Sequence, residues 1–344
     1  MLLGVLLATA GFGQSRPCDP GNLLETEDSA FVCLHREESD GHPVLLLHGI
    51  SSNHRFWDLN EANSLSLHLQ AAGFDVWNLD FRGHGAALFK DNGRRQTGGW
   101  HIDDYGEHDI KSAVDHIREQ TQRAQVSVVA HSMGGMAMAI YFSAYGDASI
   151  RSLVIAGSPM SFEHPDILMR LASSGRLSFF PVPTPLFGRV AARLPRSPLE
   201  VDDLMWNPEN VAQDTRKELL REIVSPMTAK ELQQLADILI GRRFVSADET
   251  VDYEAALKDV SVPSLVIAGR ADQIAPADRV YAYYDLLGGE ANAFVLAGRS
   301  QGFATDYGHL DLSLARNAPT ELYPIIEDWL TRHSIEGAPS PTSE

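Results

Sequence analysis

Short apolar runs bounded by turn-forming residues recur along the chain. Continuous apolar runs are typical of parallel strands that are covered on both faces of a sheet. We predict strands at PVLLLHG (43–49), FDVWNLD (74–80), VSVVA (126–130), SLVIAG (152–157), SLVIAG again (264–269) and NAFVLAG (292–298). Upstream, LLETEDSAFVCLHREE (23–38) predicts two short strands around a turn, an antiparallel start to the sheet.

Helix-like segments alternate with these runs. They lie near 61–72, 104–120, 133–145, 277–287 and 318–333. This alternation predicts an α/β fold with a doubly wound, mostly parallel sheet.

One interval breaks the alternation, because residues 160–253 contain helix-like pieces and no strand pattern. A connection of this length is usually a functional insertion. We therefore predict a helical cap at 160–253, inserted after the sixth strand, and a core formed by 14–159 and 254–335.

The turn after the VSVVA run carries a polar side chain at the point where strand pattern changes to helix pattern. Ser132 lies there, in AHSMG (130–134), which matches the G-x-S-x-G turn with alanine for the first glycine. Such a turn is strained and lifts the serine hydroxyl above the sheet edge. The alternative is a serine that only caps the following helix.

A glycine turn, His48-Gly49-Ile50, follows the run PVLLL. A sharp turn there allows the Ile50 N–H to face the same oxygen as the Met133 N–H, which would form an oxyanion hole. The alternative is an ordinary turn at the end of a strand.

An aspartate and a histidine follow the later strands. Asp272 comes directly after the run at 264–269, where a carboxylate can orient an imidazole or, alternatively, cap a turn. His309 lies in the loop before the last helix. Chain order Ser132, Asp272, His309 is the order that the serine turn motif requires, whereas a lone loop histidine is usually just solvated.

Taken together, LLLHGISSNHRFW, NLDFRGHG, DDYGEHDIKSAVDHIREQ, VVAHSMGG, GRADQIAP and DYGHLDL resemble the α/β-hydrolase superfamily. The segment from Trp100 through Ser132 is similar to the acid lipase and related bacterial lipase/esterase group. The resemblance covers most of 40–333 and is least in the insertion.

The resemblance implies that Ser132 is a nucleophile, His309 its general base and acid, and Asp272 the group that orients the imidazole. Ile50 and Met133 would supply the oxyanion donors. We therefore expect a serine hydrolase that cleaves carboxylic esters through an acyl-enzyme. A thioesterase, lactonase or amidase of the same fold, or a catalytically silent binding protein, remain alternatives.

Large apolar side chains in the insertion predict part of a substrate pocket. We assign Phe179, Phe187 and Trp206 to an acyl-binding surface for a small-molecule or lipid ester. Alternatively, these side chains pack among themselves as the core of the cap.

From the remaining polar residues we predict neither a cofactor nor a metal ion. The run His101 to Asp109 contains possible ligands, but its acidic residues begin a predicted helix, where they complement the helix dipole. His84, in the loop motif RGHG, is predicted to be structural. The formal net charge of −18 would repel nucleic acid and anionic lipid, so we expect neither as a partner.

The amino-terminal residues MLLGVLLATAGFG (1–13) predict a signal peptide, or alternatively an apolar arm packed on the domain. A secreted or periplasmic location follows from the first interpretation and a cytoplasmic one from the second. The two cysteines, Cys18 and Cys33, would form a disulfide in an exported protein and otherwise remain buried thiols. The tail at 336–344 is predicted to be disordered.

Overall fold

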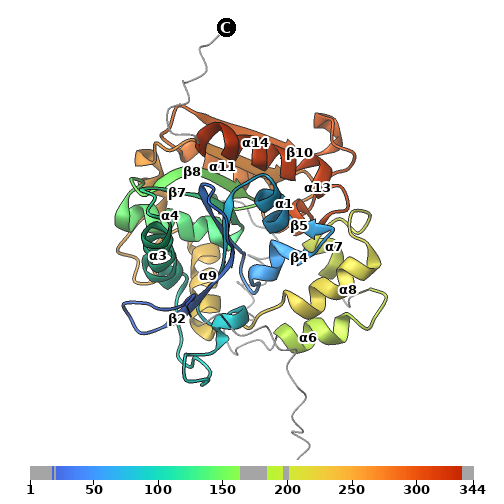
Figure 1. The fold of residues 1–344 in the computed structure, drawn as a ribbon. Helices are drawn as coiled ribbons and strands as arrows, with labels where there is room; N and C mark the ends of the chain where they lie inside the picture. Colours follow the sequence, from blue (N-terminus) through green and yellow to red (C-terminus); the bar gives the residue numbers. More distant parts are fainter. Residues whose placement is uncertain (1–17, 19–20, 163–183, 197–200, 335–344) are drawn as a thin grey trace, which may run out of the picture.

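The computed structural model describes residue 18 and residues 21–162, 184–196 and 201–334 (Figure 1). Its main sheet has eight strands in the order β1-β2-β6-β3-β7-β8-β9-β10. Their bounds are β1 Leu23–Glu25, β2 Phe31–Glu37, β3 Pro43–Leu47, β6 Asp75–Asp80, β7 Val126–His131, β8 Ile150–Ala156, β9 Ser264–Gly269 and β10 Asn292–Ala297. Only β2 runs antiparallel to its neighbours. The predicted doubly wound, mostly parallel sheet is confirmed.

Both faces of the central strands are apolar. On β3, Leu45 and Leu47 belong to one buried cluster, and Val44 and Leu46 belong to the other. The first cluster packs under α3 (Lys111–Thr121), α4 (Met133–Tyr145) and α11 (Ala277–Leu286), and the second under α1 (Leu65–Ala71) and α14 (Tyr323–Ser334) (Figure 1). Burial on both sides explains why these strands appear in the sequence as continuous apolar runs.

The predicted helix at 104–120 is interrupted. It consists of α2 (Ile102–Asp104), a π-helical stretch η3 (Tyr105–Ile110) and α3. Gly106 lies so close to α4 that a Cβ there would be 2.6 Å from the Ala137 carbonyl oxygen. The wider turn of η3 also directs the side chain of Asp109 toward Arg82. Arg82 Nε donates to Asp109 Oδ1 at 2.7 Å. A tertiary contact and a buried ion pair thus decide a local feature that periodicity does not reveal.

Shorter elements complete the core. A two-stranded ribbon, β4 (Asp58–Asn60) with β5 (Asn63–Ser64), precedes α1 and shortens the helix predicted at 61–72. The remaining short helices are η1 His54–Phe56, η2 Gly85–Leu88, α10 Tyr253–Ala256, η5 Leu257–Asp259, η6 Arg299–Gln301, α12 Asp311–Leu314 and α13 Ala318–Glu321.

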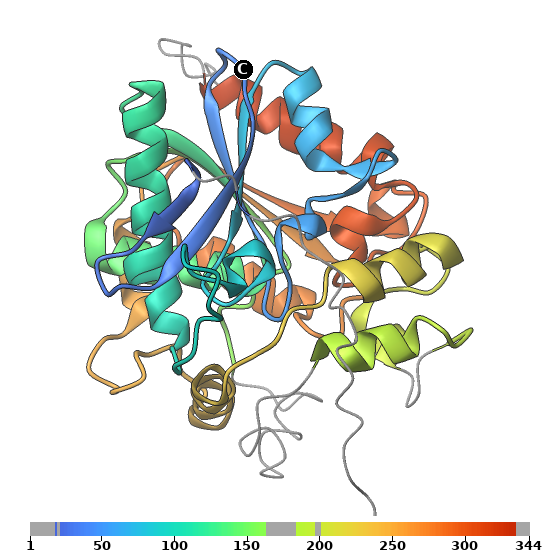
Figure 2. The ribbon, with the colours of Figure 1, turned by 60° about the horizontal axis from the view of Figure 1, so that its bottom comes forward.

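The described part of the insertion consists of helices joined by loops, with one isolated bridge between Val245 and Asp252. Its helices are α6 (Thr184–Ala191), α7 (Val201–Met205), α8 (Gln213–Glu222) and α9 (Ala229–Gly241). They lie along one end of the molecule (Figure 2). The side chain of Glu231 on α9 is buried, where it accepts hydrogen bonds from the Tyr105 hydroxyl and the Thr228 N–H. The cap is therefore anchored to η3 through a satisfied buried carboxylate.

A disulfide joins Cys18 to Cys33, as predicted for the exported form. The predicted signal peptide at 1–13 and the tail at 336–344 lie outside the described residues. Within the described part of the chain, every helix is too short or too polar to cross a membrane.

Candidate active site

Ser132 lies in a strained turn between β7 and α4. Its backbone has φ 54° and ψ −122°, a combination that non-glycine residues rarely adopt. Small neighbours permit the turn, since a Cβ at Gly134 would be 2.7 Å from the His48 carbonyl oxygen. The Ser132 side chain makes no capping hydrogen bond to α4. Its hydroxyl is therefore available to other groups at the carboxyl edge of the sheet.

His309 and Asp272 meet Ser132 at this edge. His309 Nε2 lies 2.9 Å from Ser132 Oγ, and His309 Nδ1 lies 2.8 Å from Asp272 Oδ2. The other carboxylate oxygen of Asp272 accepts the N–H groups of Ile274 and Ala275 at 2.9 and 2.8 Å. Asp272 thus caps its own turn and also contacts the imidazole. The two roles that the sequence offered as alternatives for this residue therefore occur at the same time.

The three residues form one directed chain of hydrogen bonds. An ionised carboxylate can only accept, so Asp272 fixes the proton on His309 Nδ1 and leaves the Nε2 lone pair facing the serine hydroxyl. All three residues are buried, with Ser132 6% exposed. This arrangement can transfer the Ser132 proton to His309 as the oxygen attacks an electrophilic carbon.

The loop after β3, residues 49–54 and named here the Gly49 loop, packs against the serine. A Cβ at Gly49 would lie 3.0 Å from Ser132 Cβ and 3.1 Å from His131 Nδ1, so any larger residue would push these side chains out of place. In the described structure, the next N–H, that of Ile50, and the first N–H of α4, that of Met133, have no hydrogen-bond acceptor. The N–H groups of Ile50 and Met133 are therefore two donors without an acceptor among the described residues. Met133 directly follows Ser132, and Ile50 directly follows Gly49, which packs on Ser132.

His131 is a residue of this site that sequence reasoning missed as a contributor. Its Nε2 donates to the His309 carbonyl oxygen at 3.1 Å, and its ring stacks on Phe56 at 4.3 Å between centroids. Burial lowers the pKa of His131 well below its usual value, so the ring is neutral. It braces the backbone of His309. No sequence signal marks it, because any residue can follow the first position of the serine motif.

The cap holds the loop that carries His309, residues 305–311, named here the histidine loop. Asn207 and Asn210 each donate from Nδ2 to the Asp306 carbonyl oxygen at 2.9 Å. Asn210 Nδ2 also donates to the buried carboxylate of Asp311 at 2.5 Å. These asparagines were not predicted, and they bind the histidine loop to the segment that follows α7.

A family model described as the alpha/beta hydrolase fold matches residues 42–300. The chain belongs to this family. The expected resemblance to α/β-hydrolases, and to acid lipases among them, is confirmed: lysosomal acid lipase/cholesteryl ester hydrolase of Homo sapiens is 34% identical over 134 residues, 35% of this chain and 34% of the lipase.

Longer matches to this α/β hydrolase have lower identity. Poly(3-hydroxyalkanoate) polymerase subunit PhaC of Haloarcula marismortui is 19% identical over 327 residues, which cover 89% of this chain and 64% of that protein. The protein of the same name from Haloferax mediterranei is 21% identical, with 88% and 61% covered. The chain thus spans less than two thirds of the length of these two relatives.

Solved structures share the fold. A thermophilic esterase from Thermogutta terrifontis superposes with a TM-score of 0.58 at 18% identity, over 91% of this chain and 98% of the esterase. A monoacylglycerol lipase from Paleococcus ferrophilus gives 0.57 at 18% identity, over 87% and 99%. At these identities the likeness concerns the fold alone.

The predicted substrate residues of this α/β hydrolase are only partly described. Phe179 lies outside the described residues, and Phe187 belongs to α6 with its side chain also outside them. Trp206 is 3% exposed and packs in the same buried cluster as Tyr307 and Leu312. With so little exposed area, Trp206 is placed as a packing residue of the cap. Its role in substrate binding stays a prediction.

The groups of possible metal ligands among the described residues include none of Ser132, His309 and Asp272. Within the described residues, one group is Cys33, His35 and Asp80, and the other is Asp28, Asp104 and His108. The Cys33 sulfur is committed to the disulfide. Asp28 binds the Arg82 guanidinium through both carboxylate oxygens, at 2.5 and 2.9 Å. Existing bonds thus already engage a ligand in each group.

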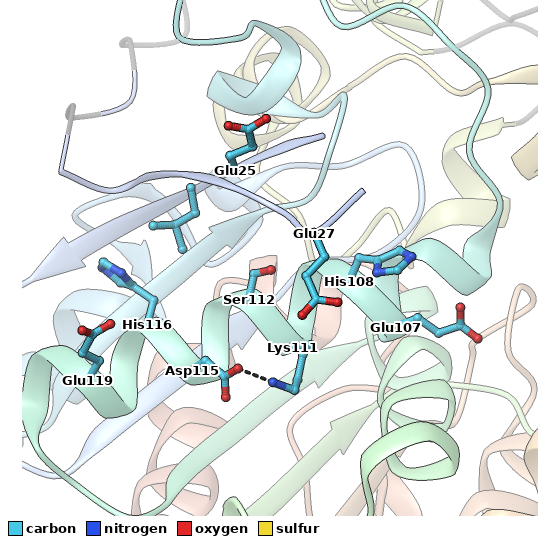
Figure 3. Close-up of a pocket in the computed structure, with 10 residues that line it drawn as sticks. Glu25, Glu27, Glu107, His108, Lys111, Ser112, Asp115, His116 and Glu119 are labelled. Atoms are coloured by element: carbon cyan, nitrogen blue, oxygen red, sulfur yellow. Dashed lines mark hydrogen bonds and ion pairs between the residues drawn. The ribbon is translucent and has the colours of Figure 1, made fainter. Parts of the chain in front are cut away.

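A surface pocket of about 260 Å³ lies between the β1–β2 turn and the η3–α3 segment (Figure 3). Its lining is mainly charged and includes the ion pair between Lys111 and Asp115. None of the predicted site residues lines it. His84 is buried elsewhere, with Nδ1 bonded to the Arg82 carbonyl oxygen at 3.0 Å, in keeping with its predicted structural role.

Proposed function

We propose that this α/β hydrolase is a serine ester hydrolase, lipase- or esterase-like. The single observation that carries the proposal is the chain from Ser132 Oγ through His309 to Asp272, with contacts of 2.9 and 2.8 Å. Ser132 attacks the ester carbonyl while His309 takes its proton, and an acyl-enzyme forms as His309 protonates the leaving alcohol. Water activated by His309 then releases the acid.

The N–H groups of Ile50 and Met133 are proposed to bind the oxyanion. Two features support this role: neither donor has an acceptor in the described structure, and Gly49 packs directly on Ser132. Donors that are aimed in advance at the developing negative charge stabilise the transition state more than the ground state.

The test is covalent labelling with a fluorophosphonate probe. We expect wild-type protein to label and to hydrolyse a p-nitrophenyl ester, and Ser132→Ala to lose both while keeping its fold. Ser112→Ala, in the pocket of Figure 3, serves as the matched control and should behave as wild type. Unchanged labelling in Ser132→Ala, or turnover within about tenfold of wild type, would refute the assignment.

The triad does not choose the leaving group, so thioesters, lactones and amides should be assayed beside esters. A catalytically silent binding protein would fail to label at all. The PhaC relatives suggest polyester synthesis, but polyester synthases of this fold use a cysteine at the elbow. Here the elbow holds Ser132, and both cysteines of the chain form the disulfide. Ester hydrolysis is therefore the better supported reaction.

The acyl-pocket assignment has its own measurement. If the cap binds the acyl chain, kcat/KM should rise from acetyl to medium-length esters, by up to about 0.8 kcal/mol per buried methylene. Trp206→Ala and Phe187→Ala should flatten that rise. A profile that falls steadily from acetyl onward would contradict the lipase-like part of the proposal.

We also propose a secreted or periplasmic location. The predicted signal peptide and the Cys18–Cys33 disulfide support it, because disulfides persist in oxidising compartments. Fractionation of the source cells, followed by sequencing of the mature amino terminus, tests this location against a cytoplasmic one.

A further inference from the structure

The Gly49 loop contains a residue in an unfavourable conformation. Ser51 has φ 54°, in the left-handed region that side chains other than glycine, asparagine and aspartate seldom adopt. A backbone of this kind costs on the order of 1 kcal/mol and persists only where surrounding contacts hold it. Ser51 directly follows Ile50, the proposed oxyanion donor, and Ile50 follows Gly49, which packs on Ser132.

The contacts that hold Ser51 come from the cap, 174 residues further along the chain. Ser51 Oγ donates to the Ser225 carbonyl oxygen at 2.7 Å, and the Ser225 N–H donates to the Ser51 carbonyl oxygen at 2.9 Å. The two residues therefore bond reciprocally, and each fixes the backbone of the other. One of these bonds depends on the Ser51 hydroxyl, so a side-chain substitution can remove it alone.

A second side chain of the Gly49 loop reaches the same segment of the cap. Asn53 Nδ2 donates to the carbonyl oxygen of Glu222, the last residue of α8, at 2.8 Å. Asn53 Oδ1 meanwhile accepts the Arg55 N–H at 2.9 Å, which starts η1. The cap segment 222–225 thus meets the loop at two points, and Gly49 holds the loop against Ser132 at its other end.

We propose that the cap segment 222–225 aims the Ile50 N–H at the oxyanion, with Ser51 and Asn53 as positioning residues. The Ile50 backbone lies between Gly49, which packs on Ser132, and Ser51, which is bonded to Ser225. Its direction is therefore set from both sides. This inference rests on the proposed function and deepens it, because it makes the cap part of the catalytic geometry.

Substitutions at Ser51 separate positioning from packing. Ser51→Ala removes the hydroxyl but keeps the cost of a side chain at positive φ, so the loop should relax away from its native path. Ser51→Gly also loses the bond, yet glycine adopts this φ without cost. We expect kcat in the order wild type, Ser51→Gly, Ser51→Ala. A residue that only fills space would give the reverse order for the two variants, since glycine removes more volume.

The expected effect falls on kcat. Removing an oxyanion donor outright costs about 10²–10³ in kcat, so misaiming one donor should cost less, about tenfold in Ser51→Ala. KM for a short p-nitrophenyl ester should stay within about twofold, because the bond to the oxyanion strengthens only in the transition state. Asn53→Asp retains the oxygen that starts η1 and replaces the donor to Glu222, so it should lower kcat in the same way.

The matched control is Glu218→Ala. Glu218 on α8 accepts from Asn60 Nδ2 at 2.6 Å and lies 3.8 Å from the Arg55 guanidinium, so it links cap and core without a bond to residues 49–54. Its kcat and KM should equal those of wild type. All variants are first checked for a wild-type melting temperature, and Asn53→Asp decides the matter if neither Ser51 variant folds.

The outcomes are distinguishable from failure of the proposed function. If wild-type protein neither labels with fluorophosphonate nor hydrolyses esters, the proposed function fails. If wild type is active and Ser51→Ala matches Glu218→Ala in kcat, only the positioning role fails. A rise in KM at constant kcat, or a lower kcat in Ser51→Gly than in Ser51→Ala, also overturns it.

Discussion

In the part of the chain that the structure describes, two buried aspartates bind histidine, and one of these, Asp272, does so next to a serine. Asp272 contacts one imidazole, that of His309, whose other ring nitrogen lies 2.9 Å from Ser132 Oγ. Asp80 contacts two imidazoles: His35 Nε2 at 2.9 Å and His54 Nδ1 at 3.0 Å. Both carboxylates have fully buried side chains.

The difference lies in what surrounds each pair. Asp80 also accepts the backbone N–H groups of His54 and Ala86, each at 2.7 Å, so it ties β6 to η1 and η2. Its two histidines stack on each other at 3.6 Å between centroids. An aspartate–histidine pair therefore does not by itself bring a nucleophile to the imidazole. The strained serine turn beside the second ring nitrogen of His309 gives the Asp272 pair the geometry that the proposed function requires, whereas the backbone donors around Asp80 tie together three elements of the core.

Asp272→Asn should give the largest effect in this comparison. An amide can donate to His309 Nδ1 and thereby favour the wrong tautomer, so kcat should fall about 10⁴-fold, equivalent to about 5.5 kcal/mol of activation free energy. The melting temperature should change little. Steady-state ester hydrolysis and thermal unfolding measure the two quantities. Near-normal turnover would mean that another acid orients His309.

Asp80→Asn should show the opposite profile. The amide cannot accept from all the donors around it, and loss of a buried, multiply bonded carboxylate should destabilise the fold by about 3 kcal/mol. Turnover of the folded fraction should fall by no more than about tenfold, because Asp80 does not contact the triad. Chemical denaturation and active-site titration check this. A drop in kcat comparable to that of Asp272→Asn would show that Asp80 also supports the reaction.

The disulfide next to Asp80 offers a smaller change. Cys33 on β2 is the register partner of Asp80 on β6. Replacing Cys18 and Cys33 together by serine opens a loop between residues 15 positions apart, which should cost about 3 kcal/mol or less of unfolding free energy. Ester hydrolysis should persist below the unfolding transition. Equal denaturation midpoints for the double variant and the oxidised wild type would contradict this expectation.

A third buried aspartate sharpens the comparison through pH. Burial raises the pKa of Asp311 to about 6 from an unfolded value of 3.8. Between these values the folded protein holds a proton that the unfolded chain has released, so stability is lost as pH rises from about 4 to 6.

In Asp311→Asn this loss is absent. Its unfolding free energy should change less across that interval than that of wild type, by on the order of 2 kcal/mol. Denaturant titrations at pH 4, 5 and 6.5 measure the difference, and Asp109, whose pKa burial likewise raises to about 6, contributes equally to both proteins. Parallel pH profiles would show that Asp311 is ionised in the fold without penalty.

The ionisation of Asp80 changes the stability of the fold with pH in the opposite direction. Burial opposes its ionisation, but His54 and His35 outweigh that penalty and hold the pKa of Asp80 well below its usual value. Its contribution is present above about pH 4 and is lost as the pH falls. The same residue type in two buried places thus shifts stability in opposite directions.

The sheet, and the three residues that meet at its carboxyl edge, are well predicted from the sequence. Continuous apolar runs mark strands that are buried on both faces, and Ser132, Asp272 and His309 each follow such a strand at its carboxyl end. The contacts between cap and core could not be predicted. Ser51 and Ser225 are 174 residues apart and meet largely through main-chain atoms, which carry no sequence signature. Asn210 and Asp311 bond through their side chains, but they are 101 residues apart and no local pattern pairs them. The π-helical turn at Gly106 likewise depends on contact with α4.

The bonds between the cap and the two loops have a consequence for how freely the protein can diverge. At three of these contacts the cap supplies only main-chain groups, those of Met205, Glu222 and Ser225, which every non-proline residue has. At Asn207 and Asn210 it supplies side-chain donors instead. The side chains of Met205, Glu222 and Ser225 can therefore vary while the path of the backbone is retained, whereas Asn207 and Asn210 should be kept and an insertion or deletion would displace Ile50 or His309. Tolerance to substitution combined with intolerance to changes in length is the pattern that homologous sequences and loop-grafting experiments should display here.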